Sequence, residues 1–370
     1  MDDRIHDHAA VLCNWSARVD PGDRVVVDVS EGAHDLGVAV AAELGSIGAD
    51  LVATYGSDEM TRAYLLEHAH LESATGDHEQ ALLEAADVYL SLGGGLNTAT
   101  TADVPDAVRQ KRSRARTDVR EARMDTDWVS TIHPTRSLAQ QAGMSYAAYQ
   151  DFVYGAILRD WESLATEMQQ LKEILDSGST VRLVTERDDA PDTDIEMSID
   201  GRTAVNSAAS VAYDSHNLPS GEVFTAPYDT EGTVFFDVPM TLGGRRVRDV
   251  RLVFSDGEVV EASAEVGEDA LEGVLDTDPG ARRLGELGVG MNRGIDRYTD
   301  NILFDEKMGD TVHLAVGRAY DANLPAGDSG NESAVHVDMI TDVSEDSRLL
   351  VDGETIQRNG RFRWEDGFEG

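Results

Sequence analysis

The first 95 residues alternate between short β-branched runs and longer segments with helical spacing of apolar residues, and this alternation restricts the fold more than any other feature. Residues 24–29, 50–55 and 87–92 have the composition of strands, and we expect helices over 36–44, 60–68 and 80–86. Strands that alternate with helices at this spacing pair in parallel and carry helices on the faces of the sheet. The sequence therefore predicts an α/β N-terminal domain with a parallel sheet.

The pattern changes near residue 178. Ser145 is placed to cap a helical stretch that runs to about Leu175 with core-type spacing. Beyond it the chain shows short alternating strands separated by turns, at 181–185, 195–199, 234–238, 251–254 and 259–265. A chain of 370 residues commonly forms two domains. We therefore predict an N-terminal domain over 1–177 that includes a long bridging helix, and an α+β, strand-rich domain over 178–370.

Acidic residues outnumber basic ones by a wide margin, since 70 Asp and Glu against 31 Lys and Arg give a net charge of −39. Nucleic acids and anionic membrane surfaces bind clustered positive charge, so this balance predicts neither as a partner. The longest apolar stretch, residues 36–44, is interrupted by Gly37 and Glu43. It is far shorter than the roughly 20 residues that a membrane span requires. The sequence predicts a soluble protein.

The surroundings of the protein can also be inferred from its composition. Lysine is almost absent, occurring only at positions 111, 172 and 307, and an acidic, lysine-poor surface is favoured in molar salt because screening removes most self-repulsion. We therefore expect a halophilic protein of haloarchaeal origin. Cys13, the single cysteine, cannot form an intramolecular disulfide, and the first eight residues are charged rather than apolar. Both features predict a cytoplasmic location.

Two short motifs in the first domain have functional and non-functional interpretations. Gly93, Gly94 and Gly95 follow a predicted strand and could face an anion, but no phosphate-loop spacing surrounds them, which favours a plain strand-to-helix turn. Residues 111–116, K-R-S-R-A-R, form the one basic cluster, and nearby acidic residues favour an exposed helix over a nucleic-acid contact.

The second domain concentrates metal-ligand side chains on short apolar segments. They are Glu222, Glu286, His313, His336 and Asp338, with Tyr320 seven residues after His313. Each has an ordinary interpretation by itself: His-x-Asp fits a solvent-facing strand, a lone histidine is usually a core residue, and a tyrosine usually packs. On a strand, however, His336 and Asp338 point to the same face. Imidazole and carboxylate together suit a divalent ion such as Zn, Co or Mn.

The number of these residues bears on the number of ions. A single catalytic ion normally keeps about three protein ligands and an open position, so five ligands are too many for one ion. Two ions that share a bridging carboxylate account for five ligands, and paired ions of this kind activate water for hydrolysis. The residues alone do not decide which carboxylate bridges.

Four blocks of sequence resemble the M29 family of metal-dependent aminopeptidases. They are N-L-P-S-G-E-V-F-T-A-P at 217–227, L-G-E-L-G-V-G-M-N at 284–292, F-D-E-K-M-G-D-T-V-H-L-A-V-G-R-A-Y at 304–320 and N-E-S-A-V-H-V-D-M-I at 331–340. Weaker similarity extends to residues 21–27 and 133–145, so the resemblance covers nearly the whole chain.

This resemblance implies a metalloaminopeptidase that acts on peptide substrates, with a C-terminal metallopeptidase domain and a homodimeric assembly. It implies two divalent ions held by Glu222, Glu286, His313, His336 and Asp338, an active-site Tyr320, and a proton-transfer role for Glu222 or Glu286. Two rival interpretations remain. One is a nucleotide- or sugar-binding α/β protein, against which the missing phosphate-loop spacing argues; the other is an inactive binding member of the same family.

The charge generates a prediction about salt. Removing molar KCl by dialysis should unfold the protein, because the repulsion among 70 acidic side chains is then no longer screened. Circular dichroism across a KCl series measures this directly. Full stability in dilute buffer would contradict the halophilic assignment.

Overall fold

The computed structural model describes residues 2–187 and 191–369. Contacts divide the chain into two compact units. The first comprises Met1–Arg159 and Ala209–Pro219, and the second comprises Asp160–Ala208 and Ser220–Gly370.

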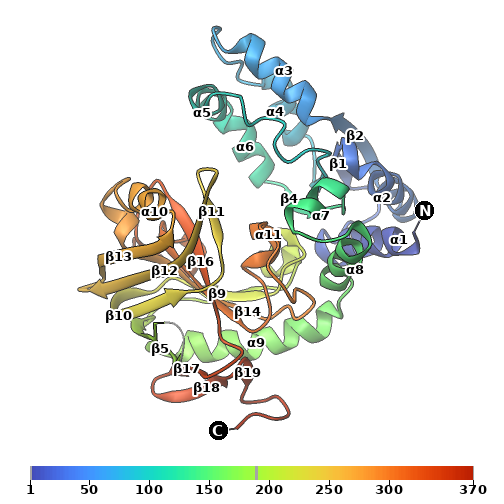
Figure 1. The fold of residues 1–370 in the computed structure, drawn as a ribbon. Helices are drawn as coiled ribbons and strands as arrows, with labels where there is room; N and C mark the ends of the chain where they lie inside the picture. Colours follow the sequence, from blue (N-terminus) through green and yellow to red (C-terminus); the bar gives the residue numbers. More distant parts are fainter. Residues whose placement is uncertain (1, 188–190, 370) are drawn as a thin grey trace. The chain divides into compact units, whose positions relative to one another are not determined.

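The first unit contains a parallel five-stranded sheet in the order β2-β1-β3-β4-β8. Its strands are β1 (Arg24–Ser30), β2 (Asp50–Gly56), β3 (Val88–Gly93), β4 (Asp127–Ile132) and β8 (Asn217–Leu218). The helices are α1 (Asp3–Ala10), α2 (His34–Ile47), α3 (Asp58–His68), α4 (Asp77–Glu84), α5 (Asp106–Ala115), α6 (Thr117–Met124), α7 (Arg136–Gln141) and α8 (Tyr146–Ile157) (Figure 1). The predicted α/β domain with a parallel sheet is confirmed.

The two short motifs of this unit have ordinary structural surroundings. The glycines at 93–95 end β3 and begin a connection that reaches α5 only at residue 106. The basic cluster lies on α5 and just beyond it, where Arg116 pairs with Glu79 and Lys111 Nζ lies 3.8 Å from a carboxylate oxygen of Glu72.

The predicted long helix is wrong in one respect, because it is two helices. Helix α8 ends at Ile157, and α9 (Trp161–Ser177) begins after Leu158 leaves the helical region at φ −86° and ψ 58°. The Asp160 side chain caps α9 by accepting a hydrogen bond from the Ser163 N–H at 3.0 Å, which satisfies a backbone donor of the first turn. Core-type spacing continues through this break, so apolar periodicity does not reveal it.

Helix α9 clusters with the second unit, whereas the sequence analysis grouped residues up to 177 with the first domain. Its buried face, which includes Trp161, Met168 and Leu175, contacts β7 (Val205–Ser207) and β9 (Glu222–Thr225). The Asn206 side chain also donates a hydrogen bond to the Ala165 carbonyl at 3.0 Å.

The second unit contains two sheets. The larger runs in the order β11-β12-β10-β6-β5-β17-β18-β19, with β13 also paired to β12, and the smaller runs β16-β15-β14-β9-β7. The remaining strands are β5 (Thr180–Thr185), β6 (Thr193–Ser198), β10 (Tyr228–Phe236), β11 (Met240–Leu242), β12 (Arg245–Ser255), β13 (Glu258–Val266), β14 (Leu284–Gly290), β15 (Thr311–Gly317), β16 (His336–Asp342), β17 (Ser347–Val351), β18 (Glu354–Arg358) and β19 (Arg361–Phe362). Besides α9, its helices are α10 (Glu268–Leu275) and α11 (Ile302–Asp305). The strand-rich α+β character is confirmed.

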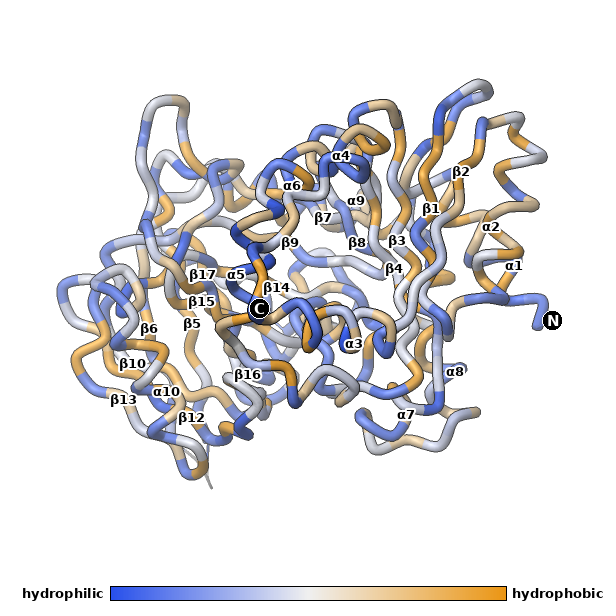
Figure 2. Tube along the Cα trace, turned by 90° about the horizontal axis from the view of Figure 1, so that it is seen from above, coloured by the Kyte–Doolittle hydropathy of each residue, from blue (hydrophilic) through white to orange (hydrophobic). Residues whose placement is uncertain are grey.

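The smaller sheet provides the most buried strands of the second unit. Every residue of β14 and of β15 is buried, although both strands carry a charged or titratable side chain. Hydrophobic segments, drawn in orange, follow strands of both units, and hydrophilic segments are frequent in the connections (Figure 2). In the part of the chain that the structure describes, no helix combines the length and the apolar character that crossing a bilayer requires.

Candidate metal centre

The register of the smaller sheet brings the five predicted ligand residues to one face. Strand β14 pairs Glu286 with Ala315 of β15, and β15 pairs Ala315 with Asp338 of β16. Paired residues, and residues two apart on one strand, share a face of a sheet. Three further pairs place the other candidate ligands on this face: His313 pairs with Gly288, His336 with Gly317 and Glu222 with Gly290. The sequence analysis could infer this geometry only for His336 and Asp338.

Each of the five side chains lies opposite glycine or alanine in a neighbouring strand. Residue 288 shows how close the approach is, because a Cβ atom added there would lie 2.1 Å from the His313 Nε2 atom. Cross-strand neighbours on one face are only about 4.5–5.5 Å apart, so a larger residue would fill the space of the ligand side chain. The small residues make room for a cluster of polar side chains above the sheet.

A β-bulge sets the position of Glu286. The register between β14 and β15 shifts between Leu284 and Glu286, which leaves Gly285 as the extra residue. A Cβ atom at Gly285 would lie 2.4 Å from the carbonyl oxygens of Gly317 and Arg318, so the bulge fits closely against the chain that follows β15. Bulges redirect side chains in this way near functional sites.

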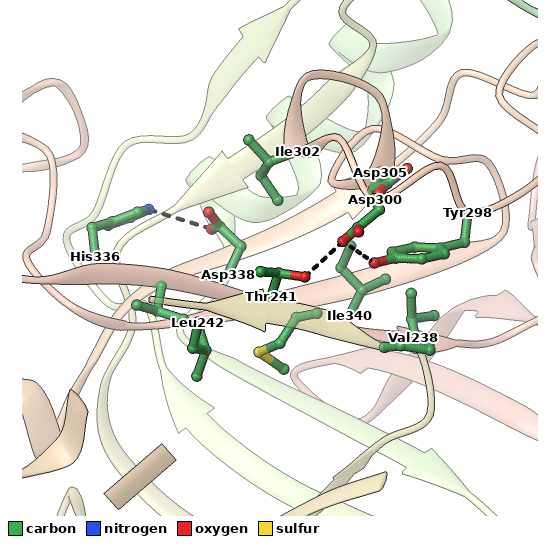
Figure 3. Close-up of a pocket in the computed structure, with 13 residues that line it drawn as sticks. Val238, Thr241, Leu242, Tyr298, Asp300, Ile302, Asp305, His336, Asp338 and Ile340 are labelled. Atoms are coloured by element: carbon green, nitrogen blue, oxygen red, sulfur yellow. Dashed lines mark hydrogen bonds and ion pairs between the residues drawn. The ribbon is translucent and has the colours of Figure 1, made fainter. Parts of the chain in front are cut away.

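Glu286 lies between the two histidines. Its Oε1 atom is 2.9 Å from His313 Nε2, and its Oε2 atom is 3.7 Å from His336 Nε2. On the first side, Glu222 Oε2 is 3.6 Å from His313 Nε2. On the second side, Asp338 Oδ1 is 3.3 Å from His336 Nε2, the pair that is drawn with a dashed line in Figure 3.

These distances define two overlapping groups of potential metal ligands. One contains Glu222, Glu286 and His313, and the other contains Glu286, His336 and Asp338. Within each group, one ligand atom from every residue lies within 4.8 Å of the others. Glu286 is the member that both groups share, with one oxygen directed to each side.

The burial of these groups favours a bound cation. Glu222 and Glu286 are buried and His313 is fully enclosed. Glu222 Oε2 is also buried, and it accepts no hydrogen bond from any residue that the structure describes. A buried carboxylate oxygen without a donor is costly unless a positive charge compensates it. A set of three carboxylates and two imidazoles fits borderline divalent metals such as Zn, Co and Mn.

The orientation of His336 is fixed from its other ring nitrogen. His336 Nδ1 donates a hydrogen bond to the Arg318 carbonyl oxygen at 2.8 Å, so Nε2 faces the carboxylates. Such a backbone contact is common for histidines that bind metal. Burial by itself lowers the pKa of His336, but the hydrogen bond that His336 donates to Asp338 and the charges of Asp338 and Glu286 outweigh it and raise the pKa to about 9.

Burial has the opposite effect on a carboxylate. It raises the pKa of Glu286 above its ordinary value, although the hydrogen bond that Glu286 accepts from His313 acts against this. For His313, burial lowers the pKa, but the hydrogen bond to Glu286 and the surrounding carboxylates shift it upward overall. Raised pKa values favour the protonated imidazoles, whereas a metal ligand has to be deprotonated, so metal binding at these residues would release protons.

Lys307 is a functional candidate that the sequence analysis missed. Its side chain is fully buried, its Nζ atom lies 3.4 Å from Glu222 Oε1, and it also pairs with Glu306. A buried ammonium group requires such partners. Two signals were visible in the sequence, since lysine occurs only three times and Lys307 lies in the same block as His313.

Tyr320 follows β15 and lies beside the second group. Its ring centroid is 4.8 Å from that of His336 and 6.0 Å from that of Phe224, while 44% of the residue is exposed. Burial of the hydroxyl, followed by the charges of Glu286 and Asp338, raises the pKa of Tyr320 above its ordinary value. The hydroxyl therefore stays protonated and can donate a hydrogen bond.

Comparison with known proteins identifies the family. The family model for thermophilic metalloproteases (M29) matches residues 1–362. The chain belongs to this family. The expectation from the four sequence blocks is therefore confirmed.

Individual relatives of this M29 protein carry aminopeptidase names. It is 40% identical to Aminopeptidase T of Thermus aquaticus over 163 residues, which are 40% of each chain, and 36% identical to Aminopeptidase 2 of Geobacillus stearothermophilus over 172 residues, again 40% of each. These matches span about 40% of the relatives' length. Aminopeptidase PepS of Streptococcus thermophilus matches at 24% identity over 91% of this chain and 92% of its own.

A solved structure supports the fold over the full length. Wild-type AmpT from Thermus thermophilus matches with a TM-score of 0.84 and 24% identity, covering 98% of this chain and 99% of that one.

The contact between Gly288 and His313 generates a prediction about metal content. The Gly288→Ala variant should bind less metal and lose about 1–3 kcal/mol of stability, because the added methyl group displaces the His313 ring within a packed sheet. Metal analysis and thermal unfolding measure the two effects. Gly273→Ala is the matched control, since nothing lies within 4 Å of its added Cβ atom. Full metal content in Gly288→Ala would show that the close approach is not required.

Proposed function

We propose that this protein is a metal-dependent aminopeptidase that releases N-terminal amino acids from peptides at a dinuclear centre. The observation that carries the proposal is the pair of ligand groups that share Glu286. Two groups with one common carboxylate suit two neighbouring ions. Membership of a metalloprotease family and the names of the relatives support the same reaction.

The protein's residues divide between two ions in this proposal. Glu222 and His313 would hold one Zn, Co or Mn ion, His336 and Asp338 would hold the other, and Glu286, which belongs to both groups, would be the shared ligand. When bound, such ions act as Lewis acids and make a water molecule acidic enough to attack a peptide carbonyl near neutral pH. Lys307 holds Glu222 in place from the side opposite the ligand oxygen Oε2.

Two side chains have roles in proton transfer and charge stabilisation. Glu222 and Glu286 both lie beside His313, and we assign to one of these two carboxylates the transfer of a proton from the attacking water to the leaving amine. The Tyr320 hydroxyl, kept protonated by its raised pKa, donates a hydrogen bond to the oxyanion that develops on the carbonyl oxygen. A contact made mainly in the transition state raises turnover more than it raises substrate affinity.

The setting of the enzyme belongs to the same proposal. We infer a halophilic, cytoplasmic enzyme from the net charge of −39 and the composition, and a homodimer from the resemblance to the family. Peptides are the substrates, and neither nucleic acid nor a membrane is a partner.

The proposed function predicts metal-dependent peptide hydrolysis. Protein purified in molar KCl should contain divalent metal and release p-nitroaniline from leucyl-p-nitroanilide, and a chelator should abolish the release. His336→Ala should lose both metal and activity, because it removes a ligand from the second group. The exposed His78 provides the matched control, as His78→Ala should keep both. Metal-free protein, or release that a chelator does not affect, would refute the proposal.

The role of Tyr320 predicts a different pattern. In Tyr320→Phe, kcat should fall about 100-fold or more while metal content stays unchanged, since the hydroxyl acts on the transition state and not on the ions. Steady-state kinetics and metal analysis on the same sample test this. Tyr228→Phe is the control, because the Tyr228 hydroxyl binds the Asp200 carbonyl oxygen elsewhere in the unit. Equal loss of metal and of kcat in Tyr320→Phe would mean that Tyr320 supports the metal centre instead.

A further inference from the structure

A cavity of about 380 Å³ opens next to the second ligand group. His336 and Asp338 line one end, and the cavity continues between the edge strand β16, the strand β11 and the segment 298–305 (Figure 3). His336, Asp338 and Ile340 alternate along β16 and share one face of the strand, and Val337 between them also lines the cavity. A molecule bound at the metal centre through His336 and Asp338 would have this cavity beside it.

The walls of the cavity are mainly apolar. Val238, Met240, Leu242, Ile302 and Ile340 contribute side chains from three separate segments. A hydrogen bond of 3.3 Å from the Val238 N–H to the Ile340 carbonyl joins two of these segments at the base. Ile302 is 49% exposed, although exposed isoleucine is unfavourable without an apolar partner.

The far end of the cavity is acidic and already hydrogen-bonded. Asp300 Oδ1 accepts hydrogen bonds from the Tyr298 hydroxyl at 2.5 Å and from the Thr241 hydroxyl at 3.0 Å (Figure 3). Arg246 lies 3.4 Å from the Oδ2 atom of Asp300. Asp305 accepts hydrogen bonds from the backbone N–H groups of residues 299 and 301 and from the Thr299 hydroxyl.

These contacts limit what can enter. Two carboxylates and one guanidinium leave a negative balance that repels an anionic side chain. The same balance attracts a cationic side chain, but Arg246 and the hydrogen bonds already made to Asp300 and Asp305 offset part of that attraction. The apolar walls therefore decide the preference. The volume lies near the lower end of the range of about 300–1,000 Å³ that is usual for small-molecule pockets, which suits one amino-acid side chain and not a large ligand.

We propose that this cavity receives the side chain of the substrate's N-terminal residue and selects apolar side chains of four or more carbons, such as those of leucine and phenylalanine. The assignment rests on the proposed aminopeptidase function. Ile302 is the specificity-determining residue that is simplest to test, since its exposure allows substitution with little effect on folding.

The test compares substrates of different size in one variant. In Ile302→Trp, the indole fills the cavity, and kcat/KM for leucyl- and phenylalanyl-p-nitroanilide should fall about tenfold or more, in the range by which apolar pockets discriminate. The value for alanyl-p-nitroanilide should stay within about twofold, because a methyl group does not reach Ile302. Val260→Trp is the matched control, as Val260 is 57% exposed on β13 and does not line the cavity.

Calorimetry with free L-leucine and L-alanine separates this proposal from the proposed function. Wild-type protein should bind L-leucine more tightly than L-alanine, and Ile302→Trp should lose the difference, whether or not the anilides are hydrolysed. Equal effects on all three anilides, or an unchanged preference for leucine in Ile302→Trp, would overturn the pocket assignment even in an active enzyme. The assignment would also be overturned if Ile302→Trp changed kcat/KM for Leu-X dipeptides only according to the second residue X, because the cavity would then bind that residue instead of the first. Absence of chelator-sensitive release in wild type would instead refute the aminopeptidase.

Discussion

Three carboxylates and two imidazoles gather on one face of a five-stranded sheet, with Glu222, Glu286 and His313 buried and His336 and Asp338 half-buried, and this is the constraint on which the second unit depends. An ionised carboxylate loses several kcal/mol of solvation when it leaves water, so charges of opposite sign and hydrogen bonds have to surround it. Lys307 supplies one buried cation next to Glu222, and the imidazoles of His313 and His336 lie next to Glu286. Metal ions in the same space would supply more positive charge at shorter range than any side chain present.

The same constraint explains why this sheet is rich in glycine. Gly288, Gly290 and Gly317 pair directly with His313, Glu222 and His336, and Gly285 forms the bulge that orients Glu286. Glycine weakens a strand because it adds conformational entropy to the unfolded chain and has no side chain to pack. Four glycines in two adjacent buried strands are therefore costly, and the space that they leave for the ligand cluster offsets that cost.

Local sequence patterns predict the strands of the first sheet and the shared face of His336 and Asp338, because both depend only on neighbouring residues. The strands 24–30, 50–56 and 88–93 could be predicted with their parallel pairing, because β-branched runs separated by helices leave few alternatives. The shared face of His336 and Asp338 follows from the period of a strand. The break at residue 158 was not predicted, because apolar spacing continues through it and the capping Asp160 resembles any exposed acidic residue.

The arrangement of the site depends on pairings between distant segments. Residues 222, 286 and 313 come together through strand registers that no local pattern specifies, and a shift of one residue would turn Glu286 to the other face. The return of residues 217–218 to the first sheet is equally non-local. The resemblance to M29 proteins indicates which five residues are the candidate ligands. Only the structure shows that Glu286 lies between the two histidines. One signal could have been read earlier: in L-G-E-L-G-V-G, Glu286 alternates with Gly288 and Gly290, which indicates a strand face kept free of large side chains around a single carboxylate.

Strand β16 connects the chemistry of the site to the choice of substrate. His336 and Asp338 belong to the candidate metal centre, and Ile340 lies two residues further on the same face at the base of the cavity. Because Ile340 is 5% exposed and pairs with His313 of β15, a substitution that repacks it would move the ligand strands as well as the cavity wall. Ile302 is different, since it lies in a separate short helix and reaches the cavity from outside the sheet. In the proposed enzyme, side-chain preference can therefore vary through α11 and β11 while the five-stranded sheet, and with it the spacing of the candidate ligands, stays fixed.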